Sequence, residues 1–211
     1  MDFMSRISAA LIEGDEEKIT ALTREALSAG TPAKQILDKA LMPAMDHVGG
    51  RRKEGEMFIP EVLLSARTMK ASLEILKPGL TEHDVKMRGK VVLGTVQGDV
   101  HDIGLNLVGI LLEGAGFEVV NLGKDVAVET FIEAIKREKP DVVGMSALLT
   151  TTMTMMRATL DAMTEAGIRD KVKVMIGGSP VTQEFADEIG ADGFGADAVS
   201  AIDVARRFVG V

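Results

Sequence analysis

Strands and helices alternate regularly through the second half of the chain. From residue 90 onward, five short apolar runs are each followed by an amphipathic segment. The predicted strands are Val91–Leu93, Phe117–Val120, Asp141–Met145, Val172–Ile176 and Gly193–Phe194. The predicted helices lie around residues 105–115, 128–138, 152–166, 181–189 and 197–208. This alternation is typical of a parallel sheet with right-handed crossovers, so we expect an α/β, doubly wound, five-stranded sheet of flavodoxin or Rossmann-like type.

The first half of the chain carries helical periodicity and no convincing strand. Gly14-Asp15 and Gly30-Thr31-Pro32 divide it into short helices, with Thr31 as the expected N-cap and Pro32 as the first helical residue of the third. A fourth helix is expected to start near Pro60 and to end at Pro78-Gly79. Its apolar face is predicted to hold Ile59, Leu63, Ala66, Leu73 and Leu76.

A change of composition separates the two halves. The segment Lys77–Gly89 is polar, contains a proline and glycines, and carries mixed charges, so we expect it to be a linker. The chain is therefore predicted to have a helical domain over residues 1–87 and an α/β domain over residues 88–211.

Unusual residues follow three of the predicted strands. Gly98-Asp99-Val100-His101 comes after the first, residues 146–152 come after the third, and Gly177-Gly178-Ser179 comes after the fourth. Open α/β sheets bind ligands at the carboxyl ends of their strands. We therefore expect these three loops to line one cleft.

One segment indicates a site for a metal-bearing cofactor, namely Asp99-Val100-His101-Asp102-Ile103-Gly104. Asp99 can orient the imidazole of His101, as carboxylates do for metal-bound histidines, and Gly104 leaves space for a bulky group beside the backbone. Plainer interpretations stay open at this point. His101 can be a surface or capping histidine, and Gly177-Gly178-Ser179 can be an ordinary turn. The hydroxyls after the third strand can simply cap a helix; they belong to Ser146, Thr150, Thr151 and Thr152.

The sequence argues against several other classes of protein. It contains no phosphate-binding loop of Walker type, no GxGxxG after the first strand, and neither the acidic cluster nor the lysine of a response regulator. The lack of cysteine excludes disulfides, thiolate zinc sites and iron–sulfur clusters. A net charge of −8 without a basic run argues against nucleic acid as a partner. No signal-peptide pattern and no apolar run of membrane length is present, so the cytoplasm is the expected location.

Three loop motifs together resemble the cobalamin-binding domain of corrinoid-dependent methyltransferases, which includes the corresponding module of cobalamin-dependent methionine synthase. They are GDVHDIG at residues 98–104, MSALLT at 145–150 and IGGSP at 176–180. The helical half is similar to the four-helix cap of that module, through residues 41–49, 55–62 and 65–70. In length the chain resembles the stand-alone corrinoid proteins of methyltransferase systems.

The resemblance implies a cofactor and the residues that hold it. His101 would be the lower axial ligand of cobalt and would displace the cofactor's own dimethylbenzimidazole, which is base-off, His-on binding. Asp99 and Thr152 would complete a hydrogen-bonded relay behind His101. The displaced nucleotide tail would run past Ser146, Leu148, Gly177 and Gly178. The other residues that would touch the cobalamin are Gly98, Val100, Asp102, Ile103, Gly104, Thr150, Ser179, Phe194, Ala198, Phe58 and Ile59.

The same resemblance implies a methyl carrier rather than an enzyme that turns over alone. A substrate-specific methyltransferase would load the corrinoid to methylcobalamin, a second methyltransferase would pass the methyl group to an acceptor, and a reductive activase would be a further partner. The helical domain would shield the methyl group and move aside for each transfer. The methyl donor stays open among methanol, methylamines, betaines and aryl methyl ethers. A cobalamin-sensing regulatory module and a cofactor-free interaction domain are the alternatives.

Two positions depart from the family pattern. Leu105 stands where a lysine is common, which removes a charge near the mouth of the cleft. Arg52 stands where methionine synthase has a phenylalanine of its methyl-shielding cap, so we expect Phe58 or a methionine to cover the methyl face instead.

Overall fold

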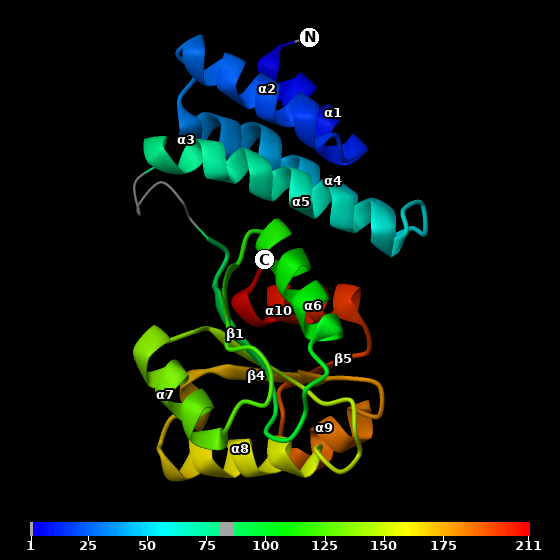
Figure 1. Ribbon diagram of the computed structural model, residues 1–211, viewed down its shortest axis with the longest axis vertical. Helices are drawn as coiled ribbons and strands as arrows, with labels where there is room; N and C mark the ends of the chain where they lie inside the picture. The colour runs from blue at the N-terminus through cyan, green and yellow to red at the C-terminus, as the bar shows by residue number, and fades with distance from the viewer. Residues whose placement is uncertain (1, 81–86) are drawn as a thin grey trace. The chain divides into compact units, whose positions relative to one another are not determined.

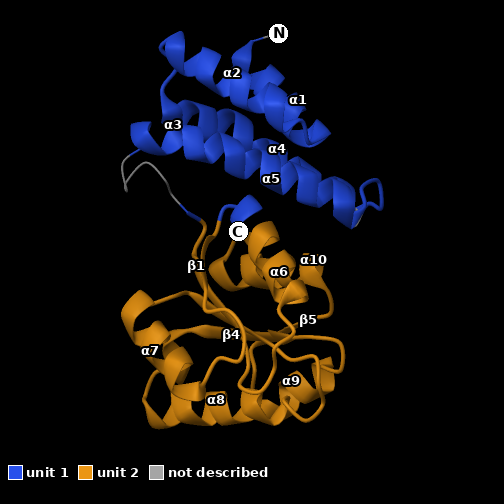
Figure 2. Ribbon diagram, viewed as in Figure 1, with its two compact units in different colours: residues 1–87, 113–116 blue, residues 88–112, 117–211 orange. Residues whose placement is uncertain are grey.

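The computed structural model describes residues 2–80 and 87–211, and it divides into two compact units. Figure 2 shows them in separate colours: one comprises residues 1–87 and 113–116, and the other comprises residues 88–112 and 117–211. We call them the helical unit and the α/β unit. The predicted linker falls partly on residues 81–86, which lie outside the described residues.

Four helices and a short 3-10 helix (Lys77–Gly79) make up residues 2–80 of the helical unit (Figure 1). They are α1 (Phe3–Glu13), α2 (Glu16–Ser28), a continuous helix from α3 (Ala33–Ile36) through a π-helical turn (Leu37–Leu41) to α4 (Met42–Lys53), and α5 (Ile59–Leu76). Asp2 and Asp15 cap α1 and α2 by accepting hydrogen bonds from backbone N–H groups. The predicted cap at Thr31 is wrong, because the N-cap of α3 is Pro32, whose backbone is extended and which offers no capping side chain.

The buried stripe of α5 differs from the predicted apolar face. Of the predicted residues, Ala66 and Leu76 are buried, whereas the other three are only half-buried. Two serines join the buried stripe because small hydroxyl groups find partners inside the bundle, and Ser72 Oγ lies 2.8 Å from Thr23 Oγ1 of α2. The buried stripe of α5 therefore mixes apolar and hydroxyl side chains; its members are Val62, Ser65, Ala66, Thr68, Met69, Ser72 and Leu76.

The α/β unit is a doubly wound parallel sheet, as the strand–helix alternation predicted. Its strands are β1 (Lys90–Thr95), β2 (Glu118–Asn121), β3 (Val142–Ser146), β4 (Lys173–Gly177) and β5 (Gly193–Gly195), all parallel and in the order β2-β1-β3-β4-β5. Helices α6 (Ile103–Gly114) and α10 (Ala198–Val209) cover one face (Figure 1). Helices α7 (Val128–Glu138), α8 (Thr154–Glu165) and α9 (Gln183–Ile189) cover the other. This strand order puts the ligand-binding crevice at the carboxyl ends of β1 and β3.

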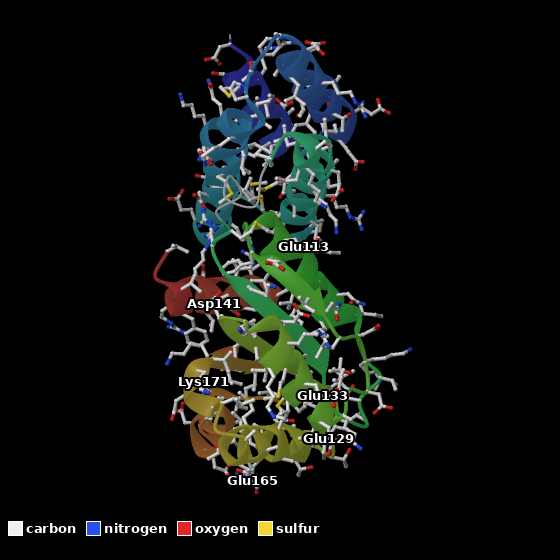
Figure 3. All side chains as sticks on the ribbon, turned by 90° about the vertical axis from the view of Figure 1, so that its left-hand side faces the viewer. Glu113, Glu129, Glu133, Asp141, Glu165 and Lys171 are labelled. Atoms are coloured by element: carbon white, nitrogen blue, oxygen red, sulfur yellow. The ribbon has the colours of Figure 1, made fainter. Side chains whose placement is uncertain are left out.

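A large apolar core fills the space between the sheet and α7, α8 and α9. Alternate residues of each strand point into it, including Val143 and Met145 of β3 and Val174 and Ile176 of β4. The outer sides of the helices carry exposed acids that are labelled in Figure 3, namely Glu129, Glu133 and Glu165. Within the described residues, no helix has the length and apolar character needed to cross a membrane.

Candidate functional site

Asp99 lies in the loop after β1 and is fully buried. Its Oδ1 atom accepts hydrogen bonds from the His101 backbone N–H (3.0 Å) and from His101 Nδ1 (2.9 Å). Its Oδ2 atom accepts from the Leu148 N–H (2.7 Å) and from the Thr152 hydroxyl (2.8 Å). The carboxylate thus ties the loop after β1 to the loop after β3.

These donors also fix the charge of the group. Burial raises the pKa of the Asp99 carboxyl, but the N–H groups of His101 and Leu148, the Thr152 hydroxyl and the His101 ring all donate to it. Together they outweigh burial and hold the pKa of Asp99 well below its usual range. Asp99 is therefore ionised at neutral pH and acts only as an acceptor.

The tautomer of His101 follows from this pairing. Because the acceptor is a carboxylate, Nδ1 carries a proton and donates it, so in the neutral ring Nε2 is the nitrogen that keeps its lone pair. The side chain of His101 is 45 % exposed, in contrast to the 0 % of Asp99 behind it. An oriented imidazole with an accessible, unprotonated nitrogen is the arrangement by which proteins present histidine to a metal.

Thr152 lies at the end of the β3 loop, just before α8, and is buried. Its hydroxyl oxygen is 2.8 Å from both Asp99 Oδ2 and the Leu149 carbonyl oxygen. The ionised carboxylate is the stronger acceptor for its single proton. The three residues predicted as a relay thus form one hydrogen-bonded series from His101 through Asp99 to Thr152.

A groove of about 210 Å³ opens beside this series, between the sheet and helices α6 and α10. Small residues dominate its walls where β3, β4 and β5 end and where α10 begins. Six of the predicted cofactor-binding residues line it; they are Gly104, Ser146, Gly177, Gly178, Ser179 and Ala198. Leu105 is buried in its wall, so the departure from lysine adds apolar surface to the groove.

Two of these glycines are required by the backbone. Gly178 has a φ of 120°, and a Cβ there would lie 1.9 Å from the Ala147 carbonyl oxygen. A Cβ at Gly177 would lie 2.8 Å from the Gly195 carbonyl oxygen. At Gly104, by contrast, a Cβ would meet nothing within 4 Å, so this position opens into free space at the start of α6.

Apolar side chains are exposed around His101. Val100 in the loop after β1 is 55 % exposed, Ile103 at the start of α6 is 85 % exposed, and Leu148 in the loop after β3 is 43 % exposed. Exposed apolar residues that gather at one site mark a binding surface more often than scattered ones do. The rim around the imidazole is therefore suited to a large, partly apolar ligand.

Some predicted site residues do not join this group. The side chain of Phe194 packs against the core beneath α8 and α9, because its neighbours Gly193 and Gly195 occupy the alternate positions that face α10. Thr150 is exposed in the β3 loop, and Asp102 accepts the first helical hydrogen bond of α6 through its carbonyl oxygen. Phe58 and Ile59, which were also predicted to touch the cobalamin, lie in the helical unit at the start of α5.

The structure also brings to this site several residues that the sequence did not single out. The Gly98 N–H donates to Asp125 Oδ1 at 2.6 Å, and the Asp99 carbonyl oxygen accepts from the Thr95 hydroxyl at 2.5 Å. Leu107 and Val108 of α6 and Ala201 of α10 line the groove. These three residues fall in predicted helices, and helical periodicity alone does not separate groove-lining residues from core residues.

Two family models match the chain, and both are described as a B12 binding domain. One covers residues 89–203, and the other covers residues 4–77. Since the first alone spans more than half of the chain, family membership rests on both the α/β unit and the helices.

The relatives agree with these matches. A trimethylamine corrinoid protein of Methanosarcina mazei is 41 % identical over 203 residues, covering 95 % of this chain and 93 % of the relative. A corrinoid protein of Desulfitobacterium hafniense is 39 % identical, and the match covers 100 % of this chain and 99 % of the relative. These relatives give no support to the regulatory alternative.

Solved structures show the same architecture. The methanol:cobalamin methyltransferase complex of Methanosarcina barkeri contains a chain that is 35 % identical, with a TM-score of 0.88 over 99 % of this chain and 80 % of that one. A cobalamin-binding protein of Desulfitobacterium hafniense is also 35 % identical, with a TM-score of 0.77 and coverage of 99 % and 98 %. The chain belongs to the family of stand-alone corrinoid proteins of methyltransferase systems, and its cofactor is a cobalamin.

Proposed function

We propose that this chain carries a methyl group on cobalamin, with His101 Nε2 as the lower ligand of cobalt. The observation that carries the proposal is the 2.9 Å hydrogen bond between His101 Nδ1 and the buried Asp99, next to a glycine-lined groove. Bound cobalamin supplies the cobalt centre that accepts and releases the methyl group. The chain supplies the ligand, its orientation and the surrounding cavity.

The residues present fit a cobalamin whose own base is displaced. Cobalt needs an imidazole nitrogen with a free lone pair, and because Nδ1 donates to ionised Asp99, Nε2 is the nitrogen that can provide it. The displaced dimethylbenzimidazole needs an apolar space nearby. The groove of about 210 Å³ exceeds the roughly 150 Å³ of an engineered cavity that holds benzene, so a two-ring aromatic group has room.

Asp99 and Thr152 have positioning roles in this proposal. The carboxylate holds the proton on Nδ1 and raises the basicity of Nε2, and Thr152 and the two backbone donors keep the carboxylate in place. If His101 were released from cobalt, Nε2 would be free to accept a proton, and the ionised Asp99 would stabilise the imidazolium.

The helical unit is proposed to shield the methyl group. Support comes from the B12 binding domain model that matches residues 4–77 and from the ring of Phe58, which is 68 % exposed at the start of α5. Ile59 follows it as the first residue of the helix. Both residues offer apolar surface to cover a methyl group in place of Arg52.

The proposal includes two enzyme partners and an activase. A substrate:corrinoid methyltransferase loads the carrier, a second methyltransferase unloads it, and a reductive activase restores the reduced state, all in the cytoplasm. Relatives named for trimethylamine and for dimethylamine are 38–42 % identical to this chain. We therefore propose a small methylated compound as the donor, selected by the partner enzyme rather than by this chain.

Electron paramagnetic resonance of the Co(II) form tests the ligand directly. Protein grown with ¹⁵N-histidine should change the nitrogen splitting of the cobalt signal from a triplet to a doublet. In labelled protein, His101→Ala should lose the doublet, whereas His47→Ala, which alters an exposed histidine of α4, should keep it. A splitting that ignores the histidine label, or a doublet that survives in labelled His101→Ala, would contradict the proposal.

A further inference from the structure

Asp125 is one of two non-glycine residues in the described part of the chain with a positive φ, at 53°. It lies in the loop between β2 and α7, outside every motif that the sequence analysis used. Left-handed backbone costs free energy for a residue with a side chain, and it persists where the surrounding contacts hold it. The contacts of Asp125 lead directly to the loop that carries Asp99 and His101.

The residue holds this loop at two adjacent points. Its carboxylate Oδ1 accepts the Gly98 N–H at 2.6 Å. Its own backbone N–H points to the Asp99 carbonyl oxygen at 2.9 Å and to the Thr95 hydroxyl oxygen, also at 2.9 Å. The left-handed backbone lets one residue bring a donor and an acceptor to the same stretch of chain.

Thr95 of β1 also holds the loop that carries Asp99. It is fully buried at the end of β1, and its hydroxyl donates to the Asp99 carbonyl oxygen at 2.5 Å. The Asp99 carbonyl therefore has two donors, one from β1 and one from the β2–α7 loop. The Asp99 carbonyl oxygen and the Gly98 N–H are both held by hydrogen bonds. The Asp99 side chain therefore leaves the backbone in a fixed direction.

We infer that Asp125 is a positioning residue for the lower ligand of cobalt. It acts through the backbone of Gly98 and Asp99, and thereby sets where Asp99 places the His101 ring. The inference rests on the proposed role of His101. It adds a third layer behind the imidazole, because the hydrogen bonds of Asp125 run to Gly98, Asp99 and Thr95.

Three variants separate the functions of the residue. Asp125→Ala removes the acceptor and keeps a strained backbone. Asp125→Gly removes the acceptor and relieves the strain. Asp125→Asn keeps an acceptor oxygen and tolerates the left-handed conformation. Lys139→Ala is the matched control, because Lys139 is exposed, has a φ of 47° and ends α7 away from these loops.

The first measurement uses apo-protein and needs no cofactor. Hydrogen exchange of the Gly98 amide, followed by NMR, should be several-fold faster in Asp125→Ala and Asp125→Gly than in wild type, since the amide loses its acceptor. Asp125→Asn and Lys139→Ala should exchange like wild type. An unchanged Gly98 amide in Asp125→Ala would overturn the inference.

The second measurement uses bound Co(II) cobalamin. In Asp125→Ala and Asp125→Gly, the fraction of cobalt with histidine-nitrogen splitting should fall. Cobalamin should also bind about tenfold more weakly, which is the smallest loss typical for residues that support a metal ligand. Asp125→Asn should restore both. Full splitting in Asp125→Ala, or an equal loss in Lys139→Ala, would overturn the inference. A wild-type protein without histidine splitting would instead contradict the proposed function.

Discussion

The two faces of the sheet are built from the same strands but differ in how they are filled. Beneath α7, α8 and α9 the strands contribute large side chains, such as Val143, Ile176 and Phe194. Beneath α6 and α10 the alternate positions near the strand ends are occupied by Gly144, Ser146, Gly177 and Gly195, and a groove remains. Strands of a parallel sheet are normally apolar on both faces. Here one face stabilises the fold, and the other leaves room for a ligand.

The period of two in a strand makes this division possible. A single residue step, from Val143 to Gly144 or from Ile176 to Gly177, moves from the filled face to the open one. The open face gives up apolar contacts that would stabilise the apo-protein. Ligand binding can recover that stability, because a ligand that binds only the folded state shifts the folding equilibrium.

The largest effect is expected from a deletion on the filled face. Phe131→Ala removes a fully buried ring from the core beneath α7 and should lower the free energy of unfolding by about 3–5 kcal/mol. Leu107→Ala removes a half-buried side chain at the groove and should cost less than about 2 kcal/mol, since part of its surroundings is already open. Urea denaturation of apo-protein measures both. Equal losses would show that the two faces are packed alike.

A matched pair of glycines sharpens the comparison. A Cβ at Gly94 would lie 2.7 Å from Phe131 Cζ on the filled face, and a Cβ at Gly144 would lie 2.5 Å from Leu93 Cδ2 on the groove face. Gly94→Ala should destabilise the apo-protein by about 1–3 kcal/mol, because the ring has nowhere to move.

In Gly144→Ala, Leu93 can turn into the groove instead. This variant should be destabilised by less than Gly94→Ala, but it should bind cobalamin about tenfold more weakly, as expected for a loss of roughly 1.4 kcal/mol. Denaturation curves and cobalamin titrations of both variants provide the measurement. The opposite pattern, with affinity lost only in Gly94→Ala, would mean that cobalamin binds on the face covered by α7, α8 and α9.

A smaller, pH-dependent effect is expected at Asp99. Its folded-state pKa lies below that of an unfolded aspartate, which is about 3.9. Its contribution to stability is therefore present above that value and is lost as the pH falls through the folded-state pKa. At pH 7, Asp99→Asn should make the apo-protein about 1–2 kcal/mol less stable. The difference from wild type should shrink steadily below about pH 4. A constant difference down to the lowest pH at which the protein folds would argue against an ionised Asp99.

The sequence predicted the sheet well because each element carries its own signal. The alternation Val143-Gly144-Met145-Ser146 marks both the strand and its two faces, and all five predicted strands overlap the observed ones. The His101–Asp99 pair was predictable because the two residues are neighbours in one loop. Asp125 was not, since its link to Gly98 depends on the position of the β2–α7 loop relative to β1. Phe194 was placed in the site by resemblance, although the flanking glycines already indicate the opposite orientation.

The most direct test of the open face compares cobalamin with cobinamide, which has the same corrin ring but lacks the nucleotide tail. If the tail occupies the groove, wild-type protein should bind cobalamin more tightly than cobinamide. Ala198→Leu, which adds apolar volume at the groove wall, should erase this preference by weakening cobalamin alone. Equal affinity of wild-type protein for the two corrinoids, or a preference that survives in Ala198→Leu, would contradict the assignment of the groove to the tail.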